Sequence, residues 1–202
     1  MKEKVVGIRD FKILLKDLER YIRAPDFLRK GRVFPNFALR PREVLANWLL
    51  CAVANFEHRR DKYTFTTDPT GGDGIICSRE GEHLVLTEHD FVPEPKAGNS
   101  ESVEDQVVRA IEHKKKKGAA YAKGKHLVVF SEAVGRWYPN RVAKRIADSH
   151  GFSSVWVVHL EKGDDSEYIY CIALLDLSKR NAPSWKVFIA STFDRWRVQR
   201  IQ

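Results

Sequence analysis

Two carboxylates in the stretch of residues 68–92 have the spacing of a metal site. Asp73 stands in a Gly-Gly-Asp-Gly sequence just before a short β run at residues 74–77. Glu88 lies within a second β run at residues 83–92, and a turn separates the two runs. If the runs pair across that turn, both carboxylates lie near the same end of a sheet. Paired carboxylates can hold Mg²⁺ or Mn²⁺, which activates water and stabilises the phosphate during phosphodiester hydrolysis.

Side-chain alternation along the second run separates its polar residues. Successive strand side chains point to opposite faces, so Glu88 and Asp90 share a face with Leu84 and Leu86. An apolar row thus becomes acidic halfway along the strand. Asp90 has two interpretations, a further metal ligand or a solvent-facing charge near a strand end. His89 points to the other face, where a packed, hydrogen-bonded histidine is expected.

Each carboxylate also has an explanation that involves no chemistry. Asp73 suits a glycine-rich turn, and Glu88 suits an exposed strand position. Taken singly, these explanations are the better ones. Two carboxylates at matching ends of one hairpin make a shared site an equal alternative.

With this hairpin, the chain resembles the PD-(D/E)XK nuclease superfamily over residues 41–130. In that family an acidic residue follows a glycine-rich turn on one strand, and a carboxylate lies on the next strand. The resemblance implies a restriction-endonuclease-like α/β fold, with a central mixed sheet flanked by helices. It also implies cleavage of DNA by Asp73 and Glu88, with Mg²⁺ or Mn²⁺ held by both carboxylates and by the backbone carbonyl of His89.

The family's second motif has a lysine two residues after its acidic residue, where this chain has Asp90. In members that lack this lysine, a helix residue can reach into the site instead. Gln106 and Lys114 share a face of the helix expected at residues 102–117 with several apolar residues, so two polar groups interrupt a stripe that should face the sheet. Either is a candidate catalytic residue, although Lys114 also begins a lysine run whose side chains could remain solvated.

Further candidates flank this constellation. Glu43 resembles the acidic residue that the first core helix of these nucleases often contributes, and attraction to the helix dipole is the alternative. Basic residues near the site could follow a nucleic-acid backbone or form a solvated face. These nucleic-acid-binding candidates are Lys115, Lys116, Lys117, Lys123, Lys125 and Arg136.

Composition supports a polyanionic partner. The chain has 202 residues, enough for one well-buried core, and a formal net charge of +8. A basic balance favours DNA, with RNA as a second option, because neutralised phosphates release counterions. The three cysteines are far apart in apolar surroundings, which predicts core positions and a reducing compartment. The absence of a signal sequence or membrane span predicts a cytoplasmic protein without a membrane partner.

The pattern of elements predicts two parts. Residues 1–40 form a helix, capped by Asp10, and an irregular linker whose aromatics pack against the domain or against a second copy, so a homodimer is a candidate assembly. Residues 41–202 form the nuclease-like α/β domain. Helices are expected at 41–57, 102–117 and 140–149, and strands at 62–67, 74–77, 83–92, 125–131, 154–160, 168–175 and 185–191.

These observations lead to two functional expectations. The first is a metal-dependent endonuclease, which retention of both acidic positions favours. The second is a nuclease-fold module that binds nucleic acid or a protein without cutting, which loss of the strand lysine favours.

Overall fold

A computed structural model describes residue 8 and residues 10–35, 37–81, 83–94, 101–133, 137–146 and 151–202. Their helices and strands are, in chain order, α1 (Phe11–Ile22), α2 (Pro25–Lys30), α3 (Pro41–Glu57), β1 (Tyr63–Thr66), β2 (Ile75–Ser78), β3 (Leu84–Val92), α4 (Val103–Lys115), α5 (Ala119–Ala122), β4 (Lys125–Ser131), α6 (Pro139–Arg145), β5 (Ser154–Gly163), β6 (Glu167–Leu175), β7 (Ser184–Ala190) and β8 (Trp196–Arg200).

The eight strands form one mixed sheet whose spatial order follows the chain order from β1 to β8. Strand β4 lies parallel to both β3 and β5, and every other neighbouring pair is antiparallel. The parallel pairs require crossovers, which α4 and α5 provide before β4 and α6 provides before β5. The predicted α/β class, with a mixed sheet and helices, is confirmed.

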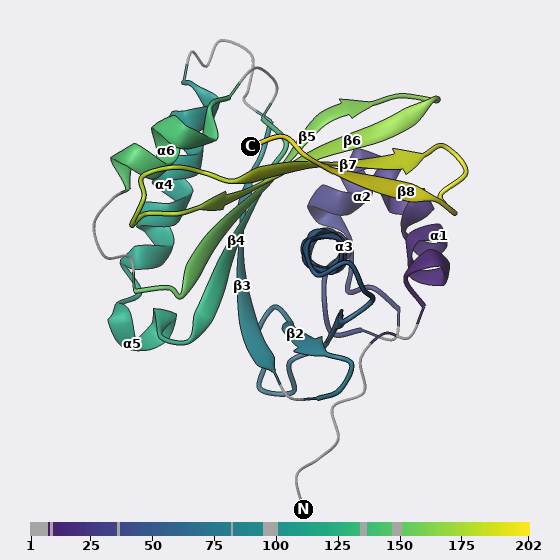
Figure 1. The fold of residues 1–202 in the computed structure, drawn as a ribbon, viewed down its shortest axis with the longest axis horizontal. Helices are drawn as coiled ribbons and strands as arrows, with labels where there is room; N and C mark the ends of the chain where they lie inside the picture. The colour runs from purple at the N-terminus through teal and green to yellow at the C-terminus, as the bar shows by residue number, and fades with distance from the viewer. Residues whose placement is uncertain are drawn as a thin grey trace, which may run out of the picture.

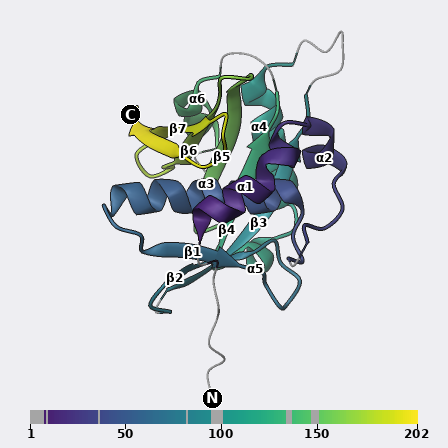
Figure 2. The same cartoon turned by 90° about the vertical axis from the view of Figure 1, so that its right-hand side faces the viewer.

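Helices cover both faces of the curled sheet (Figure 1). The segments α1, α2 and α3 pack on one face, and α4, α5 and α6 lie on the other. Figure 2 shows α1 lying along α3 above strands β1 and β2. The face under α3 carries the larger core, in which Trp48 is fully buried and donates its indole N–H to the Phe11 carbonyl at 3.1 Å. The N-terminal helix therefore shares the main core of the domain.

Local sequence explains the principal helices. Asp10 caps α1 by accepting from the backbone N–H of Lys12 and Ile13 at 2.8 and 3.1 Å, as its position before an apolar stripe predicts. Pro41 starts α3, where its missing N–H leaves no intrahelical bond unmade. Both helices, and strand β4, have the predicted positions.

The expected irregular linker is wrong for residues 25–30, which form α2. Pro25 occupies the first turn of this helix, where its missing N–H leaves no intrahelical bond unmade. Leu28 and Phe34 are buried in the main core, whereas Phe27 remains 59% exposed. Most of the linker's apolar side chains thus pack against the domain.

Two other expectations need correction at the C-terminal end. Helix α6 ends at Arg145 rather than near residue 149, and residues 147–150 lie outside the described part of the chain. Strand β8 was not predicted, because its five residues include two exposed arginines, Arg197 and Arg200, as is common for a protected edge strand.

The predicted burial of Cys51, Cys77 and Cys171 is confirmed. None of the described helices is long and apolar enough to cross a membrane.

The start of β2 passes so close to α3 that only glycine fits at position 74. Gly74 has a φ of +131°, and a Cβ there would lie 2.5 Å from Asn47 Nδ2 and 3.1 Å from Thr87 Oγ1. Gly81 also has a positive φ, +79°, but its added Cβ would meet nothing within 4 Å. Close packing at Gly74 therefore fixes how the residue before it meets β3.

We expect Gly74→Ala to lower the free energy of unfolding by about 3 kcal/mol, because backbone strain and steric overlap add. Gly81→Ala is the matched control and should lose only about 1 kcal/mol, from backbone strain alone. Urea unfolding of both variants measures the difference. Equal losses would contradict the close packing at Gly74.

Candidate functional site

The hairpin of β2 and β3 places Asp73 directly beside Glu88. The carbonyl of Gly74 accepts from the Thr87 N–H at 2.9 Å, which continues the antiparallel pairing beyond the end of β2. One residue further along, Asp73 lies opposite Glu88, and Asp73 Oδ2 accepts from the His89 N–H at 2.7 Å. The side chain of Asp73 thus takes the place of a backbone acceptor and is held against β3.

Helix α4 supplies a cation to the same site. Lys114 Nζ lies 2.5 Å from Glu88 Oε1, and the two residues are only 8% and 7% exposed. Lys117, just beyond the helix, places its ammonium 3.6 Å from the same oxygen. Lys114 therefore does reach from the helix to the strand carboxylate.

Tyr121 on α5 completes the surroundings of Glu88 and was not predicted from the sequence. Its hydroxyl donates to the Glu88 carboxylate and accepts from Lys117 Nζ at 2.9 Å. The ammonium groups of Lys117 and Lys125 lie 4.5 and 4.0 Å from the centre of its ring. Its position three residues after a glycine with a positive φ, Gly118, gave no periodic signal that could have identified it.

The two carboxylates have opposite electrostatic environments. Burial raises the pKa of Asp73, and the nearby charge of Glu88 raises it further against the lowering effect of the His89 N–H. Burial alone would also raise the pKa of Glu88, but hydrogen bonds from Lys114 and Tyr121 outweigh it and leave that pKa below its ordinary value. Neighbouring carboxylates with pKa values shifted in opposite directions are typical of functional sites.

Asn47 on α3 connects the two strands of the site. It is fully buried, and its Nδ2 donates to the Asp73 carbonyl at 3.1 Å. Its Oδ1 lies 3.3 Å from His89 Nε2. One amide side chain thus contacts the backbone of Asp73 and the imidazole ring of His89. A polar residue among the apolar residues of α3 was the only sequence signal for it.

The other predicted residues on this strand and on α3 lie close by. His89 packs toward α3 as expected, and burial, assisted by the charge of Arg42, lowers the pKa of its ring to about 3. Burial raises the pKa of Glu43, and the nearby charge of Asp73 raises it further. One of its oxygens accepts from the Arg40 N–H at 2.8 Å, so Glu43 also caps its own helix.

Asp90 lies at the edge of the site. It is partly exposed, and its Oδ2 lies 3.5 Å from His113 Nδ1. The guanidinium of Arg42 lies over the Phe91 ring at 4.8 Å. Burial lowers its pKa, and the nearby charges of Asp73 and Asp90 oppose that effect. Arg42 is a further cation near the site and was not predicted, because an arginine at a helix start has no distinctive pattern.

Gln106 lies away from the carboxylate pair. It is eight residues before Lys114 on α4, about 12 Å along the helix. It is 3% exposed and donates to the Glu101 carbonyl at 3.3 Å. Of the two helix residues considered, the structure brings only Lys114 to Glu88.

The predicted basic residues divide into two groups. Lys117 and Lys125 adjoin the site through Tyr121, whereas Lys116 and Lys123 are exposed and Lys115 lies 3.5 Å from Glu112 on the helix surface. Arg136 lies outside the described residues.

Comparison with models of protein families, with characterised proteins and with solved structures gives no match. The function of this protein is therefore inferred from the geometry of the site.

A divalent cation such as Mg²⁺ needs oxygen ligands. Within the described residues, no three His, Cys, Asp or Glu side chains are grouped as a metal site. Asp73, Glu88 and the His89 carbonyl provide two carboxylates and one backbone oxygen. Mg²⁺ is commonly held by one or two carboxylates, with water and substrate phosphate filling its other positions. The residues fit Mg²⁺ or Mn²⁺, provided that Lys114 yields an oxygen of Glu88.

The two carboxylates should respond oppositely to neutralisation. Asp73→Asn keeps an oxygen that can accept from His89 and removes a buried charge, so stability at pH 7 should not fall. Glu88→Gln leaves the Lys114 ammonium buried without its partner, which should cost about 3 kcal/mol. Urea unfolding at pH 7 measures both, and a larger loss for Asp73→Asn would contradict this assignment of the two environments.

The same pair predicts a pH dependence. Because the pKa of Glu88 is lowered in the folded state, its stabilisation is present above its unfolded pKa of about 4 and disappears as the pH falls through the folded pKa. The loss caused by Glu88→Gln should therefore shrink in acid. Because the pKa of Asp73 is raised, any gain from Asp73→Asn is present above that raised pKa and also disappears in acid. Unfolding measured from pH 7 to pH 3 tests both signs.

Proposed function

We propose that this protein is a metal-dependent nuclease that hydrolyses DNA phosphodiester bonds at Asp73, Glu88 and Lys114. The observation that carries the proposal is the buried ammonium of Lys114, which lies 2.5 Å from Glu88 and comes from the helix that follows the hairpin. Two carboxylates and a lysine at one place are the groups that metal-assisted phosphodiester hydrolysis uses.

The order of elements supports assignment to the PD-(D/E)XK superfamily, which we propose as the fold family. Helix α3 precedes the antiparallel strands β1, β2 and β3, and α4 leads to β4, which lies parallel to β3. Asp73 at the start of β2 and Glu88 within β3 match the family's acidic positions. Lys114 takes over the role of the strand lysine that Asp90 replaces.

The residues of the site have separate roles in the proposed reaction. When bound, Mg²⁺ supplies a Lewis acid and lowers the pKa of a water molecule. Asp73, Glu88 and the His89 carbonyl would hold the cation, and Asn47 holds the Asp73 carbonyl and the His89 ring in place. Lys114, released from Glu88, stabilises negative charge on the phosphate. The low pKa of His89 makes its ring a neutral packing group rather than a proton carrier.

The substrate contacts in this proposal are to the backbone of the nucleic acid. The ammonium groups of Lys117 and Lys125 lie against Tyr121 next to Glu88, and they offset the charge of the carboxylates for an approaching phosphate. The net charge of +8 acts in the same direction.

A second candidate function is binding of nucleic acid without cleavage. It is favoured by the saturation of Glu88, whose carboxylate already interacts with Lys114, Lys117 and Tyr121. A carboxylate neutralised in this way would not repel a phosphate backbone, so the same cluster suits a binding surface.

Cleavage of supercoiled and single-stranded DNA with Mg²⁺ or Mn²⁺ distinguishes the two functions. We expect the wild type to cut, and Asp73→Asn and Lys114→Met to lose about 100-fold or more in rate, because each removes a group that acts on the reacting phosphate. Lys115→Met is the matched control, since it removes a surface lysine one residue away. Salt-dependent binding with no cutting by the wild type would contradict the nuclease and favour the binding module.

A further inference from the structure

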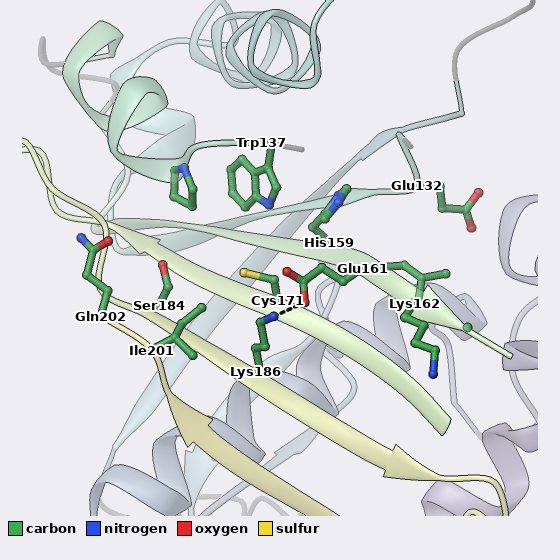
Figure 3. Close-up of a pocket in the computed structure, with 13 residues that line it drawn as sticks. Glu132, Trp137, His159, Glu161, Lys162, Cys171, Ser184, Lys186, Ile201 and Gln202 are labelled. Atoms are coloured by element: carbon green, nitrogen blue, oxygen red, sulfur yellow. Dashed lines mark ion pairs between the residues drawn. The ribbon is translucent and has the colours of Figure 1, made fainter. Parts of the chain in front are cut away.

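A hollow on the sheet is lined by His159, Cys171 and Lys186 (Figure 3). The strand register places it on the same face as Glu88, further along the strands. Helices α4 and α6 cover the residues of β5 and β6 nearest to Glu88, such as Val155 and Ala173. Beyond α6, the face is open and forms a hollow of about 650 Å³. This volume is within the range of pockets that hold small organic ligands.

The strand register shows which side chains face this hollow. One transverse row runs from His159 through Cys171 and Lys186 to Gln199. The neighbouring row of the same face runs through Ile169, Phe188 and Arg197. The alternate residues, such as Val187, point into the main core under α3. The open face thus combines aromatic, apolar and cationic side chains.

An aromatic wall closes one side of the hollow. Trp137, just before α6, lies beside His159, with ring centres 5.7 Å apart. Trp137 is partly exposed and His159 is 2% exposed. The indole therefore presents a surface to the hollow, and the buried imidazole packs against the indole. A flat ring can stack on such a wall.

The floor presents a charged donor and a charged acceptor side by side. Lys186 Nζ on β7 lies 2.7 Å from Glu161 Oε2 at the irregular end of β5. Both side chains line the hollow and remain about one third exposed, at 31% and 36%. Gln202 lies at the opposite side and adds a further amide.

We propose that this hollow binds a nucleotide. Its base stacks on Trp137, and its polar edge bonds to Glu161 and Lys186. A nucleobase is flat and carries hydrogen-bond donors and acceptors on one edge, which the lysine and the glutamate match together. A simple anion fits less well, because Glu161 and Glu132 also line the hollow. A wholly apolar ligand would leave the ion pair without a partner for its remaining bonds.

Arg197 lies just outside the hollow, on the row next to Lys186, where a phosphate that extends from the bound base would meet it. Its guanidinium lies 3.4 Å from the centre of the Phe188 ring, next to Lys186 on the neighbouring row. Arg197 is exposed and, among the described residues, is ion-paired with no carboxylate. The nucleotide is either free or part of a single strand, and both share this chemistry. The inference does not depend on cleavage at Glu88.

The test is a binding titration in EDTA, which excludes metal-dependent cleavage. The probes are the four deoxynucleoside monophosphates and a fluorescein-labelled ten-nucleotide single strand. We expect Lys186→Gln and Glu161→Gln each to weaken binding about tenfold or more, and Glu161→Gln to change the order of base preference as well. Trp137→Leu should weaken the binding of all bases, because stacking is lost.

Lys179→Gln is the control, because it removes one exposed cation from a turn outside the hollow. Melting curves show whether each variant is folded. Binding of monophosphates as tight as that of the oligonucleotide identifies a free nucleotide, and tighter binding of the oligonucleotide identifies a single strand; both support the site. No binding of either probe at millimolar concentration, or equal weakening by Lys179→Gln, would overturn it.

Discussion

The ammonium of Lys114 and the carboxylate of Glu88 form a charge pair that is almost removed from water. Burying both charges carries a large desolvation cost, and their attraction offsets it only when the geometry is good and further hydrogen bonds are made. Tyr121 and Lys117 supply those further contacts. The positions of α4, α5 and β3 are thus coupled, since moving any one of them would leave a buried charge unsatisfied.

The packing of α4 makes this pair attainable. Val107 and Ile111 are fully buried on the helix face that also carries Lys114, so the apolar contacts determine where the lysine lies. On the other side of the sheet, Asn47 and Gly74 bring α3 against the start of β2. Two helices, one on each face, therefore hold one strand pair in place. The raised pKa of Asp73 shows that its buried charge costs stability there, as is common where a protein retains a site for a ligand.

Sequence patterns predicted the elements whose signals are local. The α3 helix follows from Pro41 and a long apolar segment, and β4 from a short apolar run. The hairpin and the placement of its carboxylates follow from strand alternation. The apolar face of α4 made both Gln106 and Lys114 candidates, and only the packed structure distinguishes them. Tyr121 and Arg42 could not be found this way, because their positions depend on how separate helices meet the sheet. Strand β8 was missed because it is short and its two exposed arginines weaken the strand pattern.

The hollow under Trp137 illustrates the same distinction. Most of its residues come from β5, β6 and β7, and the others come from the segments after β4 and β8 and from the start of α6 and the segment before it. They are adjacent only because the strands pair in chain order across the curled sheet. No periodicity or motif in the sequence brings Glu161 and Lys186 together.

X-ray diffraction from crystals containing Mn²⁺, recorded for its anomalous signal, tests the central claim most directly. The account predicts one strong peak about 2.1 Å from an oxygen of both Asp73 and Glu88, with the Lys114 ammonium displaced from its contact with Glu88. Crystals of Asp73→Asn should lack the peak. Absence of the peak in the wild type at millimolar Mn²⁺, with Lys114 still on Glu88, would contradict the proposed metal site.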